Sequence, residues 1–392
     1  MRRFSRYLAA ACAAASLAAP APAAAQSAAA WYTGVTSPPQ GGAQHASVSQ
    51  GIGLVRVTID YSSPHVHSPS GVDRRGKIWG KGGLVGEGMT SFPIGTCGDG
   101  CPWRGGANEN TVFTTTHALT VQGQRLPAGS YGLHFIPQAG GDWTIIFSKV
   151  ANAWGSFTYD PKEDALRVAA KPRKSEYHED LTYEFRDRRP DGATAVLRWE
   201  DLELPFALKV DDVNGLYVAR MREELRSTGG FDWRGWTTAA QFCLANQVHL
   251  DEALLWAQRA LQPAFFGEEN FTTLSTLGEA ELANGKIQEG KATLAKALNL
   301  PTAGVLDIHQ VGRQLIAMRR PADAVEVFET NVRLHPNDWP VRFGLARGYA
   351  ALGQRDKAIA QARLALPQAP DSVNRLVVSD FIASLEAGKS GN

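Results

Sequence analysis

Small residues and prolines recur every 34 positions in the last third of the chain, and this period limits the fold more than any other feature. The matched pairs are Gly278 and Gly312, Ala324 and Ala358, and Pro336 and Pro370. A period of this length fits two packed helices joined by a turn. The sequence therefore predicts a stack of helix pairs in this part of the chain.

The residue types at the repeated positions are those that close helix packing and helix termination require. Gly312 and Ala346 supply small side chains where the first helices of two pairs approach their neighbours closely. Pro336 and Pro370 stop the second helices, because proline cannot continue a helix. The pattern is typical of tetratricopeptide repeats, which present a concave surface to peptides or proteins. A generic helical bundle is the alternative.

We expect about four helix pairs over residues 233–388, preceded by a linker helix within residues 211–232. Cys243 falls in the first pair, where we expect a small core residue in a helix.

The region from residue 45 to residue 210 shows a period of two. Val55, Val57 and Ile59 alternate with polar residues, as in a half-buried strand. Similar short runs, including residues 156–159, are separated by Gly/Pro turns, and this predicts an all-β antiparallel sandwich or barrel. The fold class is therefore α+β in separate domains, all-β first and all-α second.

The N-terminus resembles a secretory signal peptide. Residues 1–25 combine three arginines, an Ala/Leu-rich run and a small-residue end, and residues 26–44 have the composition of a flexible leader. Cleavage would change the formal net charge from +1 to −2, which does not suit nucleic-acid binding. We expect a periplasmic or secreted protein with no membrane span and no cofactor.

Cys97 and Cys101 lie four positions apart in a Gly-rich stretch. In an oxidising compartment a short-loop disulfide is the favoured outcome. A metal site would need further ligands nearby, and a redox pair usually has the Cys-x-x-Cys spacing.

Six ordered blocks of residues 44–210 resemble the bacterial family known as domain of unknown function 2911. The blocks are QHASVSQ at 44–50, IDY at 59–61, GKIWG at 76–80, WRGGANENT at 103–111, LPAGSYGLH at 126–134 and AWGSF at 153–157. The resemblance implies an exported β-rich domain that is sometimes followed by tetratricopeptide repeats, and it implies no particular reaction. This chain departs from the pattern in the long loop that carries Cys97 and Cys101.

Polar and aromatic residues concentrate just before residue 111, where strand-edge loops of such folds place ligand contacts. We expect a small-molecule or glycan site in which charged and polar groups hold an anionic or polyol ligand and tryptophans provide a stacking face. The candidate residues are Trp79, Trp103, Arg104, Asn108, Glu109 and His134. The alternative is a buried polar network in which Arg104 pairs with Glu109.

A second hypothesis for the β-rich region is a metal site. His45, Glu109 and His134 would form a two-histidine, one-carboxylate set that activates water. The sequence thus leaves three functions open: an exported binding protein with a peptide or protein partner on the repeat, a metal-assisted periplasmic hydrolase, and a purely structural adaptor. Whether the chain is an enzyme stays open.

Overall fold

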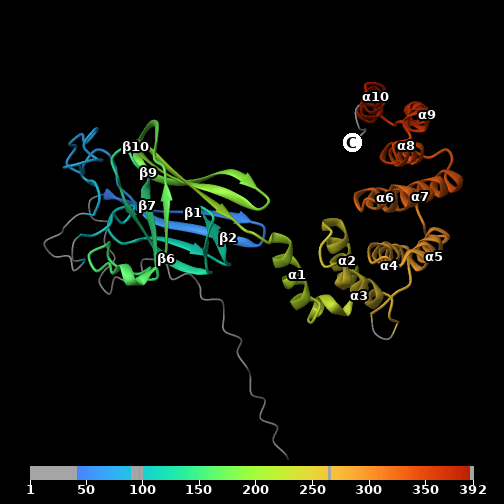
Figure 1. Ribbon diagram of the computed structural model, residues 1–392, viewed down its shortest axis with the longest axis horizontal. Helices are drawn as coiled ribbons and strands as arrows, with labels where there is room; N and C mark the ends of the chain where they lie inside the picture. Colours follow the sequence, from blue (N-terminus) through green and yellow to red (C-terminus); the bar gives the residue numbers. More distant parts are fainter. Residues whose placement is uncertain (1–41, 90–96, 98–99, 264–265, 389–392) are drawn as a thin grey trace, which may run out of the picture. The chain divides into compact units, whose positions relative to one another are not determined.

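The computed structural model describes residues 42–89, 97, 100–263 and 266–388 (Figure 1). These residues fall into two compact units, and the boundary in the sequence lies between Asp211 and Asp212. The first unit is built of antiparallel strands and the second of helices, which confirms the predicted fold class.

The β unit is a sandwich of two antiparallel sheets. The first sheet has six strands in the order β1 (Gln44–Ile52), β2 (Val55–Ser63), β3 (Thr111–Thr115), β6 (Gly129–Ile136), β7 (Trp143–Ser148) and β8 (Asp164–Ala170). The second has four, in the order β5 (Gln124–Leu126), β4 (Leu119–Val121), β10 (Gly192–Lys209) and β9 (Arg173–Arg189).

The alternating pattern of β2 explains its place in the sandwich. Val55, Val57 and Ile59 are fully buried, while Arg56 between them is exposed. Successive side chains of a strand point to opposite faces, so one face of β2 joins the core. Tyr61 continues that face and meets Tyr183 of β9 in an edge-to-face contact 4.8 Å between ring centroids, which links the two sheets.

One predicted strand is absent. Residues 156–159 form a turn, because Gly155 adopts the left-handed conformation with φ +66° and redirects the chain just before them. In contrast, β9 and β10 are longer than the short runs in the sequence indicate. β-bulges near Glu200, which has φ +56°, interrupt the alternation without ending the strand pairing.

The helical unit contains ten α-helices within the described residues. They are α1 (Val213–Glu224), α2 (Trp233–Asn246), α3 (Leu250–Ala260), α4 (Phe271–Ala283), α5 (Ile287–Leu298), α6 (Val305–Ala317), α7 (Pro321–Leu334), α8 (Val341–Ala351), α9 (Arg355–Ala365) and α10 (Ser372–Glu386). From α2 to α9 they form four pairs. Cys243 is buried in α2, as predicted.

The small residues of the repeat lie where helices touch. A side chain at Gly312 of α6 would collide with the ring of Phe328 on α7. The ring therefore packs on the bare backbone of α6, and Phe328 is fully buried. Figure 1 shows α4, α6 and α8 on the inner side of the arc formed by this unit, with α5, α7 and α9 outside. No helix in the described part of the chain is long and apolar enough to cross a membrane.

Candidate functional sites

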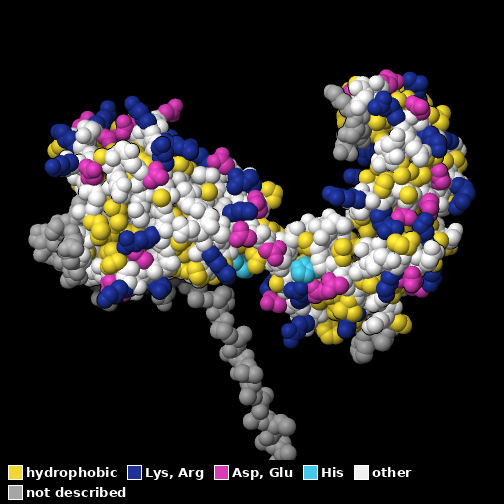
Figure 2. Space-filling view, viewed as in Figure 1, with side chains coloured by type: hydrophobic (Ala, Val, Ile, Leu, Met, Phe, Trp, Pro, Cys, Tyr) yellow, Lys and Arg dark blue, Asp and Glu magenta, His cyan; other side chains and the backbone are white. Residues whose placement is uncertain are grey.

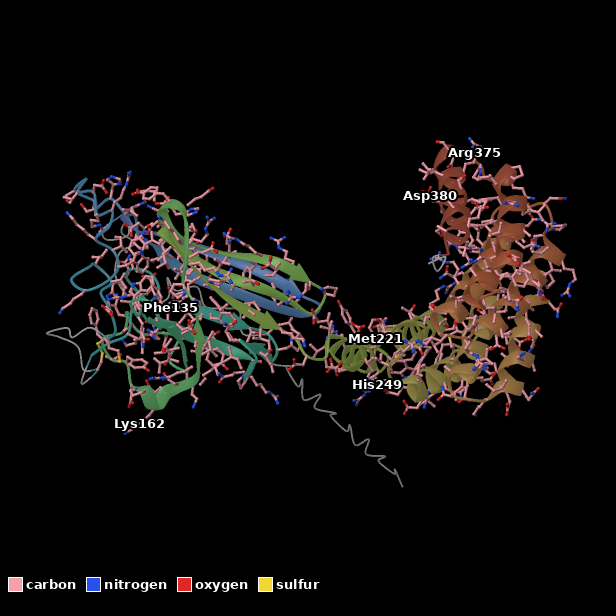
Figure 3. The ribbon with its side chains drawn as sticks, turned by 45° about the horizontal axis from the view of Figure 1, so that its top comes forward. Phe135, Lys162, Met221, His249, Arg375 and Asp380 are labelled. Carbon is pink, nitrogen blue, oxygen red and sulfur yellow. A yellow bond between two sulfur atoms is a disulfide. The ribbon has the colours of Figure 1, made fainter. Side chains whose placement is uncertain are left out.

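The polar candidates of the β unit gather on the outer face of the six-stranded sheet. Leu133 and Phe135 of β6 point into the core, and Figure 3 labels Phe135 there. His134 between them points to the opposite face, where the segment after β7 covers it. We call the group formed by Arg104, Asn108, Asn110, His134 and Ser156 the Arg104 cluster.

His134 is a neutral hydrogen-bonding group in this cluster. It is 2% exposed, and its Nδ1 lies 2.8 Å from Ser156 Oγ. Burial, and secondarily the charge of Arg104, lowers the pKa of His134 to about 4. The imidazole therefore pairs with the serine hydroxyl at neutral pH without a positive charge, and it is a weak base there.

Arg104 is a half-buried cation without a carboxylate partner. Its guanidinium donates to the carbonyl of Asn108, lies 5.0 Å above the ring centroid of Phe157, and packs on the backbone of Gly155. Burial lowers its pKa, and the nearby charge of Glu109 acts in the opposite direction. Among the described residues no ion pair joins Arg104 to Glu109, so the pairing considered from the sequence is not formed.

Backbone geometry fixes the loop around this guanidinium. Asn108 has φ +58°, a left-handed conformation that asparagine tolerates better than most residues. Asn110 is buried: its backbone N–H donates to the carbonyl of Ala153, and its Nδ2 donates to the carbonyl of Val150. Its Oδ1 has no hydrogen-bond donor among the described residues. The cluster thus retains an unused acceptor and a cation with unused donors.

Trp79 and Trp103 lie together, but in a different place from the Arg104 cluster. They form an aromatic group with Trp143 and Trp199, with ring centroids 5.2–6.2 Å apart. Trp199 is 1% exposed, and Trp79 and Trp103 are half-buried. These rings pack largely against one another, and the indole N–H groups of Trp79 and Trp199 find no acceptor in the described part of the chain.

The structure does not bring the proposed metal ligands together. His45 is exposed on the edge strand β1, and β2 and β3 separate it from His134 on β6. With ~4.8 Å between neighbouring strands, the two backbones lie roughly 14 Å apart. In the residues that are described, no three His, Cys, Asp or Glu side chains are grouped to hold a metal ion.

The predicted disulfide between Cys97 and Cys101 is present (Figure 3). Cys97 Sγ lies 2.8 Å from the carbonyl oxygen of Ser156. Cys97, which belongs to the stretch that distinguishes this sequence, thus lies beside the Arg104 cluster.

A second polar site lies on the helical unit and was not predicted residue by residue. Residues 275, 309 and 343 are spaced by 34, as are residues 279, 313 and 347 one helical turn later. They occupy equivalent positions on α4, α6 and α8, and we call this set of six residues the first-helix face. Arg313 is its exposed member, Arg347 is half-buried, and the other four are buried. The period could have identified them, because it aligns Glu279 with Arg313 and Arg347.

The first-helix face holds polar groups without partners. His309 is 9% exposed, and its Nδ1 has no hydrogen bond within the described residues. Burial, followed by the charges of Arg347 and Arg313, lowers its pKa to about 4. A side chain at Gly344 of α8 would lie 2.7 Å from that nitrogen, so α6 and α8 meet closely here.

The two arginines of this face are also unpaired. Arg313 is exposed and Arg347 half-buried, and neither forms an ion pair or a hydrogen bond with any described residue. The pKa of Arg347 is lowered by burial and, to a lesser degree, by the positive charge of Arg313. Figure 2 shows Lys or Arg side chains projecting from the inner edge of the helical unit.

These features describe a two-unit protein: a β-sandwich with a buried polar cluster, followed by a helical repeat with a cationic inner face. Comparison with protein families identifies both parts. Residues 43–208 match the family described as "Protein of unknown function (DUF2911)", and residues 315–377 match the tetratricopeptide repeat. The β unit thus matches the model of that family, and the helical unit carries tetratricopeptide-type repeats.

Solved structures give matches with low similarity. One is YrrB, described as a TPR protein with an unusual peptide-binding site, at 18% identity and a TM-score of 0.25, covering 44% of this chain and 86% of that one. Another is MamA, at 16% identity and a TM-score of 0.27, covering 38% of this chain and 85% of that one. These values are too low to bear on what this chain binds. No curated protein matches the chain.

Proposed function

We propose that this chain is a non-catalytic binding protein that holds a peptide or protein partner on the first-helix face. The observation that carries this proposal is the pair of guanidinium groups there, on Arg313 and Arg347, which have no hydrogen-bond or ion-pair partner among the described residues. Arg347 is half-buried and so has lost part of its hydration without gaining a hydrogen bond, and a bound partner can supply one. Stacked helix pairs also offer a long surface that suits an extended polypeptide.

Phage display against the full-length chain tests this function. We expect random twelve-residue peptides to be enriched and to bind the purified chain, with affinity reduced at least tenfold in the double variant Arg313→Gln/Arg347→Gln. The matched control is Arg333→Gln/Arg355→Gln, which removes two exposed arginines from α7 and α9. Equal binding by both double variants would place any partner elsewhere.

A second candidate function is the binding of a small anionic or polyol ligand at the Arg104 cluster. It is favoured by the half-buried Arg104 guanidinium, which has no carboxylate partner, and by the Oδ1 of Asn110, which has no hydrogen-bond donor among the described residues. Thermal-shift measurements with phosphate, gluconate and glucose should show stabilisation by at least one of them, and Arg104→Gln should abolish it. If none of them stabilises the β unit, the buried polar network is the better account.

We also infer that the chain is exported with cleavage after residue 25. The signal-like sequence supports this inference, although it lies outside the described residues, and so does the Cys97–Cys101 disulfide, because disulfides persist in oxidising compartments. Mass spectrometry of the mature protein should find Gln26 at its N-terminus. Retention of residues 1–25 would contradict export by this route.

A further inference from the structure

The first-helix face carries one glutamate and two arginines, and their charges indicate which chemical class of partner it binds. This step rests on the proposed function. Glu279, Arg313 and Arg347 occupy the same position on successive first helices. A glutamate in such a row would ordinarily neutralise one arginine, but among the described residues no ion pair joins Glu279 to either of them.

Glu279 stays outside the polar contacts of its own helix. Thr276 accepts a hydrogen bond from Gln241 of α2, and Ser275 donates to the carbonyl of Thr272. Glu279 is 6% exposed and has no hydrogen bond to any described residue. Burial raises its pKa to about 8, so the carboxyl group is mostly protonated at neutral pH and leaves the two arginines uncompensated.

Arg347 of α8 is positioned by a group of aromatic side chains. Its guanidinium carbon lies 4.6 Å from the ring centroid of Phe343, which stacks on Trp339 at 6.0 Å and meets Phe381 edge-to-face at 5.3 Å. The stacking restricts the guanidinium plane and leaves its N–H edge free. Such an edge matches the two oxygens of a carboxylate.

We propose that the first-helix face binds an extended acidic segment of a partner protein. Carboxylates of the segment contact Arg313 and Arg347, and an N–H donor of the same segment is accepted by the Glu279 carboxyl group. Packed helices are ~9 Å apart and an extended chain advances ~3.3 Å per residue, so the two carboxylates should be about three residues apart. A nucleic acid is disfavoured because the chain has a formal net charge of only +1.

The composition of phage-selected peptides tests this proposal. Peptides selected on the full-length chain should be rich in Asp and Glu, with acidic residues about three positions apart. Selection on Arg313→Glu/Arg347→Glu should yield Lys- and Arg-rich peptides instead. Enrichment of basic or apolar peptides by the unmodified chain would overturn the charge assignment and leave the proposed function standing. No enrichment at all would contradict both.

The role of Glu279 is tested with one selected acidic peptide carrying a fluorescent label. Glu279→Leu removes the acceptor, and we expect about tenfold weaker binding. Glu279→Gln keeps a carbonyl acceptor and should restore binding to within about twofold of the unmodified chain. Melting curves establish that both variants are folded. Unchanged binding by a folded Glu279→Leu chain would remove Glu279 from the site.

Discussion

Burial keeps His134 neutral in the folded chain, and this gives the β unit a pH-dependent stability. The folded-state pKa is about 4, below the ordinary value of 6.5. As the pH falls from 6.5 to 4, the unfolded chain takes up a proton that folded His134 does not. Unfolding is therefore favoured by acid in this window, and the stability is fully present only above pH 6.5.

His134→Gln should remove this dependence. We expect the variant to be less stable at pH 7, because glutamine replaces a buried imidazole that pairs with Ser156. The gap to the unmodified chain should shrink by up to about 3 kcal/mol as the pH falls to 4. Denaturant unfolding at a series of pH values measures the gap. A constant gap would mean that His134 titrates alike in both states.

At the residue scale, the sequence predicted most members of the Arg104 cluster but not the hydrogen bonds between them. Arg104, Asn108 and His134 were singled out and do lie together. Ser156 was missed, because the value of a serine depends on a contact with β6 that no local pattern reports. The metal hypothesis failed for the same reason: nothing in the spacing of His45 and His134 states how many strands separate them.

At the scale of elements, close helix packing in the repeat depends on single glycines. Gly312→Ala would force its methyl group against the Phe328 ring. Overpacking costs ~1–3 kcal/mol, and the better helix propensity of alanine offsets up to about 1 kcal/mol. We expect a net loss of about 1 kcal/mol in the stability of the helical unit. Thermal unfolding compared with Gln310→Ala, an exposed control on α6, measures it. Unfolding at or above the temperature of the unmodified chain would show that Phe328 moves freely.

The helices of the repeat could be predicted because contacts between neighbouring helices recur every 34 residues and require the same residue types each time. Gly and Pro at intervals of 34 mark the ends and crossings of helices directly in the sequence. The strands were predicted less completely. The bulges of the β9–β10 pair interrupt the alternation, and the turn after Gly155 resembles a strand in composition. Both features depend on local backbone conformations that the residue types do not indicate.

At the scale of the whole molecule, the two units offer different chemistry. The β unit holds its polar groups beneath a covering segment, and the helical unit presents unpaired cations on its inner side. A small ligand suits the first arrangement and a polypeptide the second. Since each unit has its own core, a variant of one site should leave the other unit folded.

Binding of a partner along the first helices of the repeat should protect their backbone amides. Hydrogen–deuterium exchange of the full-length chain, with and without a phage-selected peptide, measures this protection. We expect slower exchange in α4, α6 and α8, with α5, α7 and α9 unchanged. Protection confined to the second helices or to the β unit would contradict it.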